Sequence, residues 1–192
     1  MPSRKKFYEM LYNTSDESKL SWYREDAPEF LKKLAKSFKG TESVLDIGCG
    51  TGTNAVYLAK LGFKVTALDF VEKALKFAEK NSKKANVNID FVHADIFNWK
   101  VSQTFDIVLD SGCLHNFRGL QRKEYKNIVL KLMNSKSYFI LVHFGRKLPF
   151  SFPIGPAKRS KNEIISLFAP ELHLLDFSLD KNGELYYYCF SK

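Results

Sequence analysis

Three glycines at alternate positions, Gly48, Gly50 and Gly52, follow an apolar run that contains the acid Asp46. Glycine suits such a turn because it adopts positive φ without strain and because a side chain would block a ligand lying against the backbone. A second acid, Asp69, closes the next apolar run 17 residues after Gly52, where a carboxylate can accept hydrogen bonds from both hydroxyls of an adenosine ribose. These residues predict a nucleoside-binding strand-to-helix turn, with an ordinary tight turn as the alternative.

The segments LDIGCGTGTN (45–54) and VTALDF (65–70) together resemble class I S-adenosylmethionine-dependent methyltransferases, and the resemblance covers nearly the whole chain. Thr53 stands where a dinucleotide-binding fingerprint would need a further glycine. The resemblance implies S-adenosylmethionine as cofactor and assigns its parts to particular residues. These are Asp46, Gly48, Cys49, Gly50 and Gly52 for the methionine part, Asp69 for the ribose and Phe70 beside the adenine.

Two later segments resemble further motifs of the same family. In HADIF (93–97), the resemblance implies that Asp95 accepts a hydrogen bond from the adenine amine and that Ile96 offers its backbone amide. FDIVLDSGCLHNF (105–117) resembles the fourth motif, which would place Asp110 beside the cofactor and its reactive methyl group.

Three residues are candidates for proton transfer: Asp110, His115 and His143. A histidine that titrates near neutrality can act as a general base, so we predict Asp110 and His115 as catalytic residues. Purely structural histidines are the alternative at both histidine positions. The three cysteines match no metal-ligand spacing, so we expect no metal site and free thiols in a reducing cytoplasm.

The first 40 residues are rich in aromatic side chains, among them Tyr8, Tyr12, Trp22 and Tyr23. Aromatic faces attract cations, so this group could bind the cationic sulfonium and exclude water, and we predict Trp22 as a cofactor contact. Alternatively, the rings only fix the segment to the sheet. WYREDAPEFL (22–31) resembles the small-molecule branch that includes thiopurine and tellurite methyltransferases.

The fourth motif narrows the methyl acceptor. Methyltransferases of exocyclic base amines usually carry an Asn-Pro-Pro-Tyr type motif where this chain has residues 110–113. Enzymes that methylate the cytosine ring use a cysteine that follows proline, whereas Cys113 follows Gly112. We therefore expect a small-molecule acceptor with a sulfur or similarly soft nucleophile. The alternatives are an RNA methyltransferase that uses the basic loop 145–161, and a catalytically silent cofactor-binding protein that acts through a partner.

Composition fits a compact enzyme. The chain has 192 residues, 45% apolar and 15% aromatic, which excludes disorder for most of it, and no apolar run approaches the length of about 18 residues that spans a membrane. The net charge of +9 permits nucleic-acid binding, although residues 72–86 place many lysines around one apolar helix face. The first ten residues lack an apolar signal region, so we expect a cytoplasmic protein. We also expect a monomer or dimer without a membrane partner.

Strand and helix signals alternate, which predicts an α/β fold in a single domain (1–192) with residues 1–40 as an N-terminal helical cap, and the resemblance implies that this fold is Rossmann-like. The resemblance implies a seven-stranded, mostly parallel sheet in the order 3-2-1-4-5-7-6, with the last strand antiparallel and helices on both faces. DKNG (180–183) predicts the turn of the final hairpin. Strands are expected near 43–47, 64–69, 89–93, 105–110, 137–144, 172–179 and 185–191.

Overall fold

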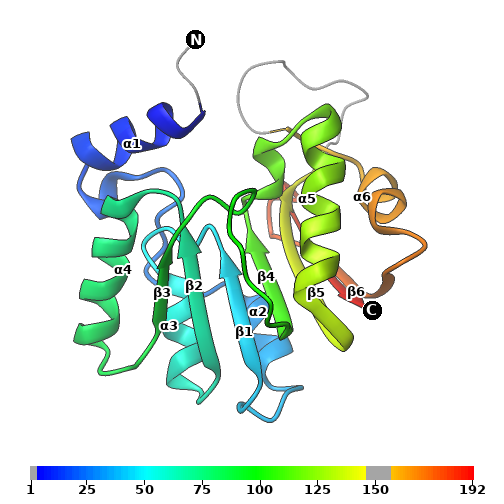
Figure 1. Ribbon diagram of the computed structural model, residues 1–192, viewed down its shortest axis with the longest axis horizontal. Helices are drawn as coiled ribbons and strands as arrows, with labels where there is room; N and C mark the ends of the chain where they lie inside the picture. The colour runs from blue at the N-terminus through cyan, green and yellow to red at the C-terminus, as the bar shows by residue number, and fades with distance from the viewer. Residues whose placement is uncertain (1–3, 146–156) are drawn as a thin grey trace. The chain divides into compact units, whose positions relative to one another are not determined.

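The computed structural model describes residues 4–145 and 157–192, which form two compact units, Met1–Trp99 and Lys100–Lys192 (Figure 1). Most of the basic loop predicted at 145–161, including Phe150 and Phe152, lies outside the described residues.

The strands form one sheet in the order β3-β2-β1-β4-β5-β7-β6, which confirms the predicted Rossmann-like class and strand order. β1, β2 and β3 are parallel, β5 is parallel to β4, and β7 is antiparallel to both of its neighbours, as predicted for the last strand. The strands are β1 (Ser43–Ile47), β2 (Lys64–Asp69), β3 (Asp90–His93), β4 (Phe105–Ser111), β5 (Met133–Phe144), β6 (His173–Leu179) and β7 (Leu185–Ser191).

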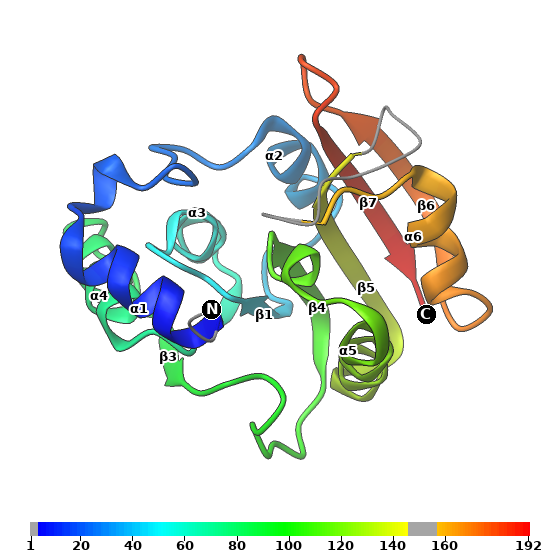
Figure 2. The ribbon, with the colours of Figure 1, turned by 90° about the horizontal axis from the view of Figure 1, so that it is seen from above.

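The first unit contains two successive strand-helix-strand crossovers, β1-α3-β2 and β2-α4-β3. β1 and β2 are mostly buried because parallel strands are covered by the helices that connect them, whereas β3, at the edge of the sheet, is partly exposed. The helix α1 lies beside α4, as both views show (Figures 1 and 2). The helices of this unit are α1 (Arg4–Thr14), the 3-10 helix η1 (Glu17–Lys19), α2 (Glu29–Ala35), α3 (Thr53–Lys60) and α4 (Glu72–Lys84).

The second unit packs two helices side by side, α5 (Gly119–Leu132) and α6 (Lys161–Phe168), and a 3-10 helix, η2 (Leu114–Asn116), follows β4 (Figures 1 and 2). Its core includes the mutually packed rings of Phe139, Phe168 and Phe190. The predicted hairpin turn is confirmed, because Gly183 N donates to Asp180 O between β6 and β7.

The fifth strand begins earlier than predicted, at Met133 instead of residue 137, directly where α5 ends. Met133 pairs with Phe105, and the register then shifts before Ile107 pairs with Tyr138. Among the described residues, no helix is both long and apolar enough to cross a membrane.

Candidate functional site

The glycine loop (residues 48–52) turns at positive φ at all three of its glycines, with angles of 68° at Gly48, 57° at Gly50 and 80° at Gly52. Gly48 N and Cys49 N both donate to Leu68 O, at 2.7 and 3.0 Å. The loop is thereby fixed against the end of β2. A side chain at any of these positions would be strained whatever space surrounded it.

The glycines differ in what a side chain would meet. A Cβ on Gly52 would lie 2.8 Å from the Cβ of Ala78, so this glycine allows α4 to approach the loop closely. The expectation that glycine leaves room for a ligand therefore does not account for Gly52. A Cβ on Gly50 would lie 3.0 Å from the Tyr12 hydroxyl, which belongs to α1.

Asp69 is bound directly to the glycine loop. Gly50 N donates to Asp69 Oδ2 at 3.0 Å, and Val71 N donates to Oδ1 at 2.9 Å. Burial raises the pKa of this carboxyl, and the backbone N–H groups oppose the rise. Each oxygen can still accept another hydrogen bond, so the carboxylate could receive the two hydroxyls of a ribose.

The turn after β3 also leaves hydrogen-bonding groups available. Asp95 Oδ1 accepts from Phe97 N at 3.1 Å, whereas Oδ2 has no partner within residues 4–145 and 157–192. The Ile96 side chain is buried, and in the same part of the chain its backbone N–H forms no hydrogen bond. One acceptor and one donor on neighbouring residues fit the edge of an adenine ring.

The other predicted cofactor residues of the first unit surround the glycine loop. Asp46 is buried in β1 and pairs in register with Ala67. Burial raises the pKa of the Cys49 thiol, so this thiol stays protonated. The carbonyl of Phe70 lies 3.1 Å from His93 Nε2, and the Phe70 ring packs edge-on against Tyr8.

Trp22 donates its indole N–H to the Tyr12 hydroxyl at 3.0 Å. The surrounding N-terminal segment is fixed to the rest of its unit by polar contacts that the sequence did not indicate. Asn81 of α4 donates to both Glu17 Oε2 and Thr51 O, and Thr53 donates to Arg24 O. Asn81 lies among the lysines of α4, so no sequence signal distinguished it from a solvated helix face.

In the second unit, Asp110 is completely buried and receives four donors. Oδ1 accepts from the backbone N–H groups of Gly112 and Cys113, and Oδ2 accepts from Leu114 N and the Tyr125 hydroxyl. Burial raises the pKa of Asp110 to about 6. Because two donors already engage each oxygen, the geometry favours a role in holding the turn after β4 over proton transfer. Sequence reasoning missed Tyr125, because its spacing along the helix indicates only core packing.

His115 and His143 have ring centroids 6.0 Å apart. Burial lowers the pKa of His115 to about 3 and that of His143 to about 4, so both are neutral near pH 7. Two buried, neutral imidazoles support the alternative that both histidines are structural. His143 Nδ1 lies 2.9 Å from Phe144 O, whereas His115 Nδ1 has no hydrogen-bond partner in the described part of the chain.

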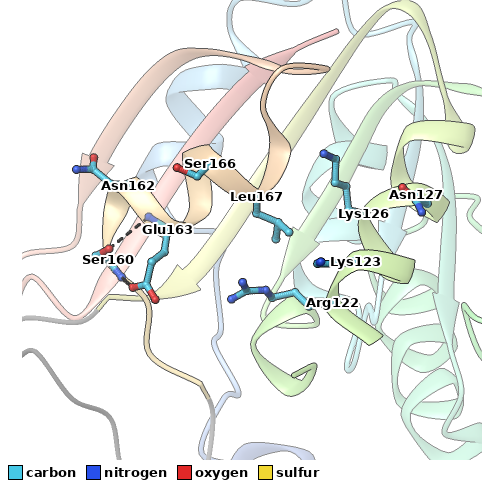
Figure 3. Close-up of a pocket in the computed structure, with 9 residues that line it drawn as sticks. All are labelled: Arg122, Lys123, Lys126, Asn127, Ser160, Asn162, Glu163, Ser166 and Leu167. Atoms are coloured by element: carbon cyan, nitrogen blue, oxygen red, sulfur yellow. Dashed lines mark hydrogen bonds between the residues drawn. The ribbon is translucent and has the colours of Figure 1, made fainter. Parts of the chain in front are cut away.

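A separate groove of ≈ 680 Å³ lies between α5 and α6 (Figure 3). Cationic side chains line one side, but Lys126 forms a 2.7 Å ion pair with Glu171, and Glu163 lines the opposite side. The lining residues are Arg122, Lys123, Lys126, Asn127, Ser160, Asn162, Glu163, Ser166 and Leu167. Across the described residues, no cluster of three or more histidine, cysteine, aspartate or glutamate side chains could hold a metal ion.

Residues 44–134 match the model of a methyltransferase domain. An uncharacterized methyltransferase of Schizosaccharomyces pombe is 36% identical over 109 residues, which are 54% of this chain and 72% of the relative. A probable S-adenosyl-L-methionine-dependent methyltransferase, TehB of Haemophilus influenzae, is 30% identical over 57% of this chain and 40% of its own length. A structure solved for the conversion of a disulfide bond into a thioacetal group during echinomycin biosynthesis superposes with a TM-score of 0.80, at 22% identity, over 97% of this chain and 92% of that one.

Proposed function

The chain belongs to the class I S-adenosylmethionine-dependent methyltransferases, and we propose that it transfers the cofactor's methyl group to a small-molecule acceptor through a sulfur or similarly soft nucleophile. One observation carries the cofactor part of this proposal. The hydrogen bond from Gly50 N to Asp69 Oδ2, 3.0 Å long, joins the glycine loop to the acid at the end of β2. A backbone cradle and a carboxylate acceptor are therefore adjacent. S-adenosylmethionine requires both, because its charged amino-acid chain and its ribose hydroxyls must be bound close together.

In this proposal the first unit binds the cofactor. Asp46 and the glycine loop hold the methionine part, Asp69 accepts from the ribose, and Asp95 and Ile96 read the adenine edge. Phe70 flanks the adenine ring. The available Ile96 N–H and Asp95 Oδ2 support this assignment, because unpaired polar groups at a partly covered site are costly unless a ligand or water engages them.

The second unit supplies the turn that follows β4. When bound, S-adenosylmethionine supplies a methyl group already activated by a positively charged sulfur, so the protein has mainly to align and desolvate the acceptor. Alignment of this kind accounts for about 7–11 kcal/mol in well-oriented intramolecular reactions. We assign Asp110 to positioning, because its four hydrogen bonds hold Gly112, Cys113 and Leu114 in place.

In this proposal His115 is not an essential base. A group with a pKa of about 3 accepts protons poorly at neutral pH. A thiol acceptor would instead lose its proton in solution and react as the thiolate. The thioacetal chemistry named for the structural neighbour involves sulfur, which supports testing sulfur acceptors first.

An acceptor screen with methyl-labelled cofactor tests the proposal. The acceptors are alkyl and aromatic thiols, inorganic oxyanions, amines, phenols and bulk RNA, and we expect label in the thiols. Label in RNA alone would contradict the small-molecule assignment and favour the RNA methyltransferase alternative. Tight cofactor binding without label in any acceptor would favour the catalytically silent alternative.

A further inference from the structure

The Tyr12 hydroxyl lies beside the glycine loop, where an ideal Cβ on Gly50 would approach within 3.0 Å of it. Tyr12 itself is 4% exposed. Within the described ranges, the hydroxyl forms one hydrogen bond, in which its oxygen accepts the indole N–H of Trp22 at 3.0 Å. A phenol also donates, so the Tyr12 O–H remains available to an acceptor on a bound ligand.

The position of this hydroxyl is fixed without a ligand. The Tyr12 ring is buried with Leu20, Val71 and Ala74, and its centroid lies 5.7 Å from that of Trp22. The segment that carries Trp22 is held by the hydrogen bond from Thr53 to Arg24 O, which is 2.9 Å long. A donor held in place in this way loses little conformational entropy when it engages a ligand.

The Tyr12 hydroxyl is also a neutral donor at any physiological pH. Burial raises the pKa of Tyr12 well above its usual range, and the negative charge of Asp69 adds to this effect. The two Asp69 oxygens already accept from Gly50 N and Val71 N and are assigned to the ribose. The acceptor for Tyr12 should therefore be another part of the cofactor.

We propose that the Tyr12 O–H donates a hydrogen bond to the α-carboxylate of the cofactor's amino-acid chain, and that the Trp22 N–H holds the hydroxyl in that orientation. This inference rests on the proposed function, which assigns the methionine part to the glycine loop. A carboxylate is the strongest acceptor in that part of the cofactor, and a hydrogen bond to a charged group is stronger than one between neutral groups. Trp22 is then a positioning residue for Tyr12, which replaces its predicted contact with the sulfonium.

The test compares two ligands that differ in the amino-acid chain. S-adenosylhomocysteine has the chain, whereas 5′-methylthioadenosine keeps the adenine and ribose but lacks it. For Tyr12→Phe, we expect calorimetry to show at least a tenfold loss of affinity for S-adenosylhomocysteine, equivalent to about 1.4 kcal/mol. Affinity for 5′-methylthioadenosine should change less than about twofold, because the lost hydrogen bond involves only the amino-acid chain.

Two further variants sharpen the comparison. Trp22→Phe keeps an aromatic ring but removes the N–H donor, so it should cause a smaller loss with the same ligand selectivity. Tyr23→Phe removes a hydroxyl from a ring packed against the same buried cluster, and it should leave the ratio of the two affinities unchanged. Thermal unfolding of each variant establishes that it is folded.

Equal losses for both ligands in Tyr12→Phe, or an unchanged affinity for S-adenosylhomocysteine, would overturn the inference while leaving the cofactor assignment intact. If Tyr12→Phe does not fold, Trp22→Phe decides, and an absence of ligand selectivity there would overturn the inference. Failure of the wild-type protein to bind either ligand would instead contradict the proposed function, and this inference with it.

Discussion

The Tyr125 hydroxyl donates a 2.6 Å hydrogen bond to Asp110 Oδ2, and both side chains are completely buried. The bond joins α5 to the end of β4, where three backbone N–H groups also donate to the same carboxyl. Burial nevertheless raises the pKa of Asp110 to about 6, so at neutral pH the fold holds a buried charge that depends on its donors. This dependence makes the stability of the turn sensitive to both pH and Tyr125.

The first prediction concerns Tyr125→Phe. In the folded state Asp110 keeps its proton up to about pH 6, whereas an unfolded aspartate loses it near pH 3.9. The contribution of Asp110 to stability is therefore full below about pH 4 and falls as the pH rises to about 6. Because the Tyr125 donor favours the ionised form, its loss should lower the free energy of unfolding by about 1.5–3 kcal/mol at pH 8 and by less at pH 5.

Urea unfolding at both pH values measures the difference. Tyr57→Phe is the matched control, because Tyr57 is a partly buried tyrosine of α3 that lies away from Asp110 in the sequence. It should change stability little at either pH. Equal destabilisation of Tyr125→Phe at pH 5 and pH 8 would contradict the link to the Asp110 charge.

The second prediction concerns Asp69→Asn. The substituted amide loses the charge and one acceptor oxygen, so the variant should bind S-adenosylhomocysteine at least tenfold more weakly, or about 1.4 kcal/mol. Its loss of affinity for 5′-methylthioadenosine should be equally large, because both ligands carry the ribose. This pattern differs from the one expected for Tyr12→Phe.

Glu72→Gln is the control for Asp69→Asn, because it neutralises a nearby exposed carboxylate that pairs with Lys76. Calorimetry should show unchanged affinities for this control. If the Asp69→Asn protein folds and binds both ligands with wild-type affinity, Asp69 does not bind the ribose.

Local patterns in the sequence predicted most of the fold. Alternating apolar runs and helical faces located all seven strands, and the glycine loop with Asp69 located the turn where β1 and β2 end. These features depend on residues close together in the chain, so they leave a periodic signal. The strand order came from the family resemblance, because periodicity carries no information on which strands are neighbours.

The remaining site features depend on long-range contacts. Asp110 was predicted as catalytic, but its donor Tyr125 lies on a helix whose spacing indicates only core packing. The lowered pKa of His115 follows from its burial beside Phe144, which no local pattern in the sequence indicates. The proximity of Tyr12 to Gly50 could not be predicted either, because it depends on how α1 folds back over the loop.

The third prediction concerns the groove between α5 and α6. Its cationic residues are offset by Glu163 and by the pairing of Lys126 with Glu171, so we expect weak binding of RNA. Methylation of a thiol should change little between about 50 and 200 mM salt, because phosphate contacts are absent from that reaction. The double variant Arg122→Ala and Lys123→Ala should turn over the thiol as the wild type does. RNA binding with a steep salt dependence that the double variant weakens would contradict this expectation and support the RNA methyltransferase alternative.

The last prediction concerns how the acceptor is activated. If a thiol reacts as the thiolate that it forms in solution, the rate with a simple alkyl thiol should rise about tenfold per pH unit below a pKa of about 8.5. A more acidic aromatic thiol should shift the profile to lower pH, because the slope follows the acceptor and not the enzyme. His115, with a pKa lowered by burial to about 3, should add no inflection between pH 6 and pH 9.

Rates for both thiols across this pH range, with wild type and His115→Ala, separate acceptor ionisation from base catalysis. His115→Ala should cost less than the roughly 100-fold loss that is the lower figure for removing a general base. His173→Ala is the matched control, because His173 is an exposed histidine at the start of β6 and none of the proposed site residues lies on that strand. An inflection at the same pH for both thiols that disappears in His115→Ala would instead identify His115 as the base, which would require bound acceptor to raise its pKa by several units.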